Sequence, residues 1–62
     1  MVHSGDEVEI VMNKAGVPPR RGTIEKVLEE DPLRLEIRWD DGHLSVLSPK
    51  AGNLHVVRAA EG

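Results

Sequence analysis

The segment RWDDGH, residues 38–43, holds the side chains of this chain that are best suited to chemistry. Two adjacent carboxylates, Asp40 and Asp41, stand two residues before the imidazole of His43. Carboxylates and imidazole are common metal ligands and common partners in general acid–base catalysis. The same letters are also typical of a hairpin tip, because an Asp-Gly pair between two strands favours a tight turn.

The hairpin is the interpretation that we favour. Two carboxylates and one imidazole are too few ligands for a closed metal site, and neither His3 nor His55 stands at a motif spacing from them. A chain of 62 residues also offers little concavity for a substrate, and no nucleophile and base stand at motif spacing. We therefore predict no catalytic residue, no metal, no cofactor and no enzymatic activity.

The length of the hairpin loop determines which residues of the two strands lie opposite each other. With Asp41 and Gly42 at the centre of a type I′ turn, Asp40 would face His43 on the outer surface. Trp39 would then face an inward-pointing residue of the next strand, whereas a three-residue loop would place it opposite His43. We expect Trp39 to anchor the core. The predicted structural hairpin consists of Trp39, Asp40, Asp41, Gly42 and His43.

In the register of this turn, the two strands would pair inward residue with inward residue. Leu44 would lie opposite Trp39, and Val46 opposite Ile37, all four on the core face. Arg38 and Ser45 would form an outward pair between them.

Alternation of apolar and polar residues predicts the strands that carry this hairpin. The first strand begins after the Gly5-Asp6 turn and alternates up to about Met12. Leu33 to Trp39 shows the strongest alternation and predicts the central strand. Two short strands follow, over about 43–49 and 53–58, while Gly16 and two prolines place residues 13–20 in a loop.

The segment 22–30 is ambiguous. Ile24, Val27 and Leu28 have the spacing of one helical face, and Thr23 could cap such a helix. A strand over the same residues requires a bulge. With the strand interpretation the chain contains five short strands, and we predict an all-β fold, a small five-stranded SH3-like barrel. It forms one domain over residues 1–62, with frayed ends at 1–3 and 59–62.

Composition limits the functions available to this fold. The chain is 39% hydrophobic and 31% charged, carries a net charge of −3, and contains no cysteine, tyrosine or phenylalanine. With one tryptophan, it cannot build an aromatic cage or a platform for stacked bases. No apolar run is long enough to span a bilayer and no signal peptide is visible, so we expect a cytoplasmic protein without a membrane partner.

The order of these motifs resembles a family of small actinobacterial domains of unknown function. The resemblance rests on Gly5-Asp6, on VPPRRG at 17–22, on GTIEKV at 22–27, on the RWDDGH hairpin signature and on Pro49. It covers nearly the whole chain and implies an SH3-like barrel, but no activity. Leu33, Leu47 and Ser48 depart from it, because the family usually has aromatic residues around these positions. A weaker likeness is to SH3-like accessory subunits of electron-transport complexes.

Two kinds of binding function remain open. The first is a docking module for a protein partner or a second copy, through an apolar patch on the outer face of the first and last strands, formed by Val2, Val11 and Val57. The alternative is nucleic-acid or ribosome binding through a local basic strip. The residues of that strip are Lys14, Arg20, Arg21, Arg34 and Arg38.

Overall fold

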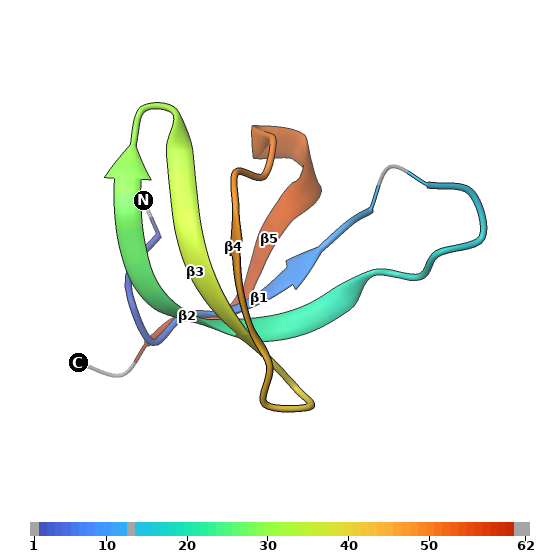
Figure 1. Cartoon of the computed structure of the whole chain (residues 1–62), viewed down its shortest axis with the longest axis horizontal. Helices are drawn as coiled ribbons and strands as arrows, with labels where there is room; N and C mark the ends of the chain where they lie inside the picture. The colour runs from blue at the N-terminus through green and yellow to red at the C-terminus, as the bar shows by residue number, and fades with distance from the viewer. Residues whose placement is uncertain (1, 13, 61–62) are drawn as a thin grey trace.

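A computed structural model describes residues 2–12 and 14–60 and is all-β (Figure 1). Its five strands form one antiparallel sheet in the order β4-β3-β2-β1-β5. The strands are β1 (Glu7–Ile10), β2 (Arg20–Glu30), β3 (Leu33–Trp39), β4 (Leu44–Leu47) and β5 (Leu54–Arg58), and the 3₁₀ turn η1 (Ala51–Asn53) leads into β5. Figure 1 shows β2 and β3 as strongly curved ribbons. The predicted all-β class with five strands is confirmed.

Strand β2 owes its shape to two bulges. Its register with β3 shifts once between Ile24 and Lys26 and again between Val27 and Glu29. An extra residue between Ile24 and Val27 allows two positions that are three apart to face the same side. Ile24 is buried and Val27 is partly buried against the core, whereas Leu28 is exposed. The strand interpretation with a bulge is therefore correct, and the helical one is wrong.

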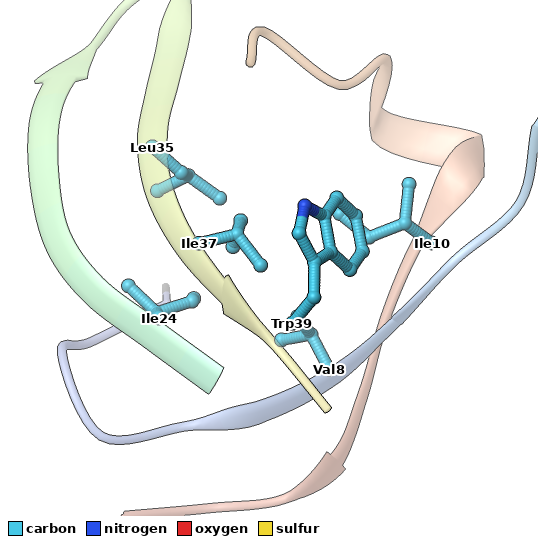
Figure 2. Close-up of a cluster of buried hydrophobic side chains, with 6 residues drawn as sticks. All are labelled: Val8, Ile10, Ile24, Leu35, Ile37 and Trp39. Atoms are coloured by element: carbon cyan, nitrogen blue, oxygen red, sulfur yellow. The ribbon is translucent and has the colours of Figure 1, made fainter. Parts of the chain in front are cut away.

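The interior is small and aliphatic, with one indole. Figure 2 shows six buried hydrophobic side chains, which are Val8, Ile10, Ile24, Leu35, Ile37 and Trp39. Trp39 belongs to the same buried cluster as Ile10, and 5% of Trp39 is exposed, so its predicted role as a core anchor is confirmed. Gly22 pairs with Trp39, and a Cβ there would lie 2.6 Å from Cγ2 of Ile37. The close approach of β2 to β3 thus requires a glycine.

The hairpin between β3 and β4 differs from the predicted one. Trp39 N donates to His43 O at 2.8 Å and Gly42 N donates to Trp39 O at 2.9 Å, so residues 40–42 form a three-residue loop. Gly42 has a φ of 92° and no described non-glycine residue has a positive φ. A type I′ turn needs positive φ at both central residues, which excludes it with Asp41. The loop is instead a turn followed by a left-handed glycine.

This loop shifts β4 by one residue and reverses its faces. Ile37 pairs with Ser45 rather than Val46, and Arg38 pairs with Leu44. Because side chains alternate along a strand, a shift of one residue exchanges the inner and outer sets. The predicted inward positions of Leu44 and Val46 are therefore wrong, and both lie on the outer face, where Leu44 is 53% and Val46 51% exposed.

Asp6 joins the two ends of the described chain. Its carboxylate accepts hydrogen bonds from the backbone N–H of Ala60 at 2.7 Å and of His3 at 2.9 Å. Only 3% of Asp6 is exposed. His3 and Ala60 thus both have a partner in Asp6, although they belong to the segments predicted to be frayed. The prediction for residues 1, 61 and 62 lies outside the described residues.

Candidate functional site

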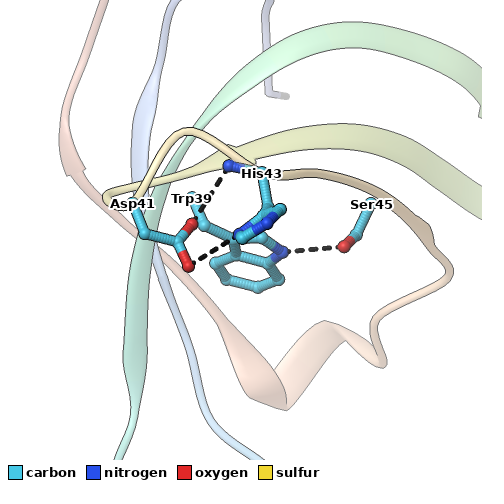
Figure 3. A network of polar contacts seen from close by, with 4 residues as sticks. All are labelled: Trp39, Asp41, His43 and Ser45. Carbon is cyan, nitrogen blue, oxygen red and sulfur yellow. Dashed lines mark hydrogen bonds and ion pairs between the residues drawn. The ribbon is translucent and has the colours of Figure 1, made fainter.

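The carboxylate that meets His43 is Asp41, not Asp40. Nδ1 of His43 lies 2.9 Å from Oδ2 of Asp41, and the His43 backbone N–H donates to Oδ1 at 3.0 Å (Figure 3). The His43 ring, followed by the His43 N–H, lowers the pKa of the Asp41 carboxyl below its ordinary value. Both contacts join Asp41 in the loop to His43 directly after it, so the predicted Asp40–His43 pair is wrong and Asp41 organises the turn.

The histidines and carboxylates do not converge elsewhere. Among the residues that the structure describes, no three His, Cys, Asp or Glu side chains are grouped so that they could hold a metal ion. His3 instead lies near Asp6, with Nδ1 4.0 Å from Oδ2. His55 pairs with Glu9 in the ladder between β1 and β5.

Three of the five residues of the predicted basic strip lie beside glutamates. Arg21 pairs with Glu9 at 3.6 Å on the sheet surface. Nε of Arg38 donates to Oε1 of Glu25. The third pair joins Arg34 and Glu29 at 3.7 Å. Each of these arginines therefore has a counter-charge of its own, which weakens the field that a phosphate backbone would meet.

The other two residues of the strip lie apart from these three. Arg20 pairs with Ile10 in the ladder, on the core side of the sheet, and its Cζ lies 4.2 Å from the centroid of the Trp39 ring. This geometry is that of a cation–π contact. Lys14 is exposed in the loop between β1 and β2. Arg20 is thus on the other side of the sheet from the three arginines that pair with glutamates.

The predicted apolar patch is also divided. Val2 is partly buried against the core. Val11 donates its N–H to Asn53 O at 2.8 Å, so it lies beyond the Ile10 end of the β1–β5 ladder. Val57 falls at the register shift opposite Glu7 and Val8, toward the other end, and 42% of it is exposed. Val11 and Val57 therefore lie toward opposite ends of the β1–β5 ladder and do not make a common surface.

A different apolar surface lies on β4. Leu44 and Val46 stand on the outer face of a strand that ends the sheet, next to Arg38 and Glu36 of β3. We call these two residues the β4 edge pair. This pair could not be predicted from the two-residue loop, which would place both side chains inward. The sequence does contain one indication of this surface. Because both Asp40 and Asp41 precede Gly42, the segment Asp-Asp-Gly suits a three-residue loop as well as a two-residue loop.

Two open grooves lie on the surface of the described residues. The larger, about 280 Å³, is apolar with a few polar groups and runs between the end of β1 and the segment after β4. Its lining residues are Ile10, Val11, Met12, Leu47, Ser48, Pro49, Lys50 and Asn53. The smaller, about 130 Å³, lies over Gly22 and is lined by side chains of both charges. The polar side chains of the larger groove include Ser48 and Lys50, and those of the smaller include Thr23 and Asp40.

Comparison of the chain with family models, with curated proteins and with solved structures finds no match. The resemblance to the actinobacterial family therefore remains an expectation from the sequence. The 3₁₀ turn is the one helical segment among the described residues, and none of them forms a helix long and apolar enough to cross a membrane.

Proposed function

We propose that this protein is a non-enzymatic docking module, an SH3-like barrel that binds a protein partner along the edge of β4. The observation that supports the proposal is the β4 edge pair: two half-exposed aliphatic side chains on an edge strand whose sequence, LSVL, contains no charge. Edge strands of soluble proteins usually carry charged residues, proline or bulges that discourage pairing with another chain. Strand β4 lacks these features, which favours strand addition by a partner.

The rest of the outer sheet surface differs from the β4 edge. It carries the cross-strand pairs Glu9–Arg21, Glu25–Arg38 and Glu29–Arg34, which balance one another. Strand β5, at the opposite end of the sheet, also exposes Val56 and Val57, but it contains His55 and Arg58 and a register shift. The β4 edge is thus the part of the sheet surface best suited to an apolar partner.

Nucleic-acid binding is the alternative, and it has less support. Its candidate arginines are paired with glutamates or placed over Trp39, and the whole chain has a net charge of −3.

A cytoplasmic location agrees with the absence of cysteine, since disulfides belong to oxidising compartments.

Affinity purification from the native host tests the docking proposal. The parent chain is compared with a double variant, Leu44→Lys with Val46→Lys, and with a control, Val17→Lys with Val57→Lys, which adds the same charge at exposed valines away from β4. Proteins that the parent and the control retain and that the β4 variant loses are identified by mass spectrometry and purified.

With a purified partner, we expect the β4 variant to raise the Kd by at least about tenfold, or 1.4 kcal/mol, while the control leaves it unchanged. Circular dichroism must show that both variants fold. A partner that binds the β4 variant as tightly as the parent would contradict the proposal.

A further inference from the structure

We propose that the β4 edge also binds a second copy of this chain, in an antiparallel pairing about a two-fold axis at Ser45. The inference rests on the proposed function, because it names an occupant for the same edge. It is carried by the backbone of β4, by the positions of the β4 edge pair and by the charges that flank them.

The hydrogen-bonding pattern of the hairpin determines which backbone groups face outward. Trp39 and His43 form a hydrogen-bonded pair. Because such pairs alternate with non-bonded ones in an antiparallel ladder, Ser45 and Leu47 direct their N–H and C=O groups toward β3. The N–H and C=O groups of Leu44 and Val46 therefore point to the free side of the strand. A second strand can bond to β4 only through these two residues.

This restriction leaves few registers for a second copy. With the axis at Ser45, Leu44 lies opposite Val46 of the second copy and Val46 lies opposite its Leu44. Opposed residues of an antiparallel pair lie on the same face, so the four aliphatic side chains would form one cluster on the outer surface. With the axis at Val46, Leu44 would instead lie opposite Ser48 of the second copy. The first register buries more apolar surface and is preferred.

The flanking charges suit the same register. Arg38 lies beside Leu44 and Glu36 lies beside Val46 on the outer face. Across the dimer, a row would read Arg38, Leu44, then Val46 and Glu36 of the second copy, with opposite charges at its two ends. A two-fold axis repeats this row in the reverse direction, so the contact is self-complementary, as an isologous interface must be.

The proposed contact between the two β4 strands contains no charged side chain, so salt would not weaken it by screening an ion pair. Each copy carries a net charge of −3, and salt screens the repulsion between the copies. Dimerisation should therefore strengthen as ionic strength rises, whereas an ion-paired contact would weaken.

Cysteine cross-linking tests the register directly, because the chain has no cysteine of its own. Leu44→Cys and Val46→Cys are prepared separately, then oxidised alone and as an equal mixture in a thiol–disulfide buffer. In the proposed register, positions 44 and 46 of different copies are about 5.5 Å apart between Cα atoms, within the range of a disulfide. Equivalent positions are offset by two residues, which places their Cα atoms beyond about 7 Å.

We expect the mixture to cross-link about tenfold faster than either variant alone, since only the mixture places two cysteines at disulfide distance. Lys26→Cys, on the exposed outer surface of β2, is the matched control for random collision. Rapid cross-linking of Val46→Cys alone would overturn the register in favour of an axis at Val46. Cross-linking of all variants at the rate of Lys26→Cys would overturn the dimer.

Sedimentation of the unmodified parent separates this inference from the proposed function. We expect its average mass to rise with concentration and with salt. A parent that stays monomeric to millimolar concentration overturns the self-pairing, while a partner that is lost only from the Leu44→Lys, Val46→Lys variant would still support docking at β4. If the parent dimerises but no such partner is found, the result supports the self-pairing and contradicts the docking proposal.

Discussion

Nε1 of Trp39 donates a hydrogen bond of 2.9 Å to Oγ of Ser45 across the β3–β4 hairpin (Figure 3). The indole is buried, and its N–H would otherwise have to be satisfied by water inside a small core. This bond requires Ser45 to face inward, and an inward Ser45 requires Leu44 and Val46 to face outward. The hydrogen bond that satisfies the Trp39 N–H therefore also places the β4 edge pair on the outer face.

Replacing Ser45 by alanine should destabilise the protein. The substitution removes the acceptor and leaves the indole N–H unsatisfied, which typically costs about 1–3 kcal/mol. Urea unfolding followed by the fluorescence of Trp39 measures the change. Ser48→Ala, at an exposed position just after β4, is the control and should leave the midpoint unchanged. Equal midpoints for Ser45→Ala and the parent would mean that the bond adds nothing to stability.

Gly42→Val should reduce stability by more than about 1 kcal/mol, because a β-branched residue is strained at a positive φ. The φ of Gly42 is 92°, and a Cβ there would meet no atom within 4 Å, so the conformation and not crowding causes the loss. Gly52→Val provides the comparison, since that position is also uncrowded but has no positive φ. A loss of the same size at both positions would exclude backbone strain as the cause.

The hairpin shows how far the sequence could predict this site. The Asp41-Gly42 pair located the turn correctly, and the alternation of β3 identified Leu35, Ile37 and Trp39 as core residues. The loop length could not be settled in the same way. Pairing apolar with apolar favoured a two-residue loop, but an edge strand can leave aliphatic side chains exposed, because burial of apolar residues is a rule with many exceptions.

The alternation of apolar and polar residues does not predict which segments far apart in the chain are in contact. The bulge in β2 could be inferred because Ile24 and Val27 are an odd number of residues apart. The bond from Ala60 to Asp6 spans 54 positions and leaves no periodic signal. The pairing of Arg34 with Glu29 and of Arg38 with Glu25 likewise depends on the register of β2 with β3, which shifts at two bulges.

Asp6 should make stability depend on acid pH. Hydrogen bonds from the backbone N–H of Ala60 and then of His3 lower the pKa of its carboxyl below the ordinary value of 3.8. A carboxyl with a lowered folded-state pKa contributes stability above 3.8, and that contribution is lost as pH falls through the folded-state value. Asp6→Asn should therefore be less stable than the parent at neutral pH, and the difference should shrink on acidification.

Urea midpoints of the parent and of Asp6→Asn between neutral pH and pH about 2 measure this convergence. Hydrogen exchange gives an independent signal, because the amide of Ala60 should exchange faster in the variant at neutral pH. A stability difference that stays constant down to the lowest pH would show that the charge of Asp6 is not the source of its contribution.

Gly22→Ala should be among the most damaging single-atom changes in the chain. The new Cβ would lie 2.6 Å from Cγ2 of Ile37 and 2.9 Å from the backbone O of Arg38, so a strand must move to admit it. Overpacking of this kind typically costs about 1–3 kcal/mol. Gly52→Ala is the matched control, since a Cβ there meets nothing within 4 Å. Thermal unfolding measures the midpoints of both variants. Equal midpoints would contradict the expected clash between β2 and β3.

Arg20→Ala should expose the indole of Trp39 while changing stability only modestly. The Arg20 guanidinium lies over the ring, and a cation–π contact at an exposed site contributes about 0.5–1 kcal/mol. Because Trp39 is the only tryptophan, acrylamide quenching of fluorescence reports its accessibility without interference, and we expect quenching to increase. Arg21→Ala is the control, since neighbouring residues of a strand point to opposite faces and Arg21 pairs with Glu9. If Arg21→Ala increased quenching as much as Arg20→Ala, the effect would come from general loosening of β2 and not from loss of the side chain that covers the ring.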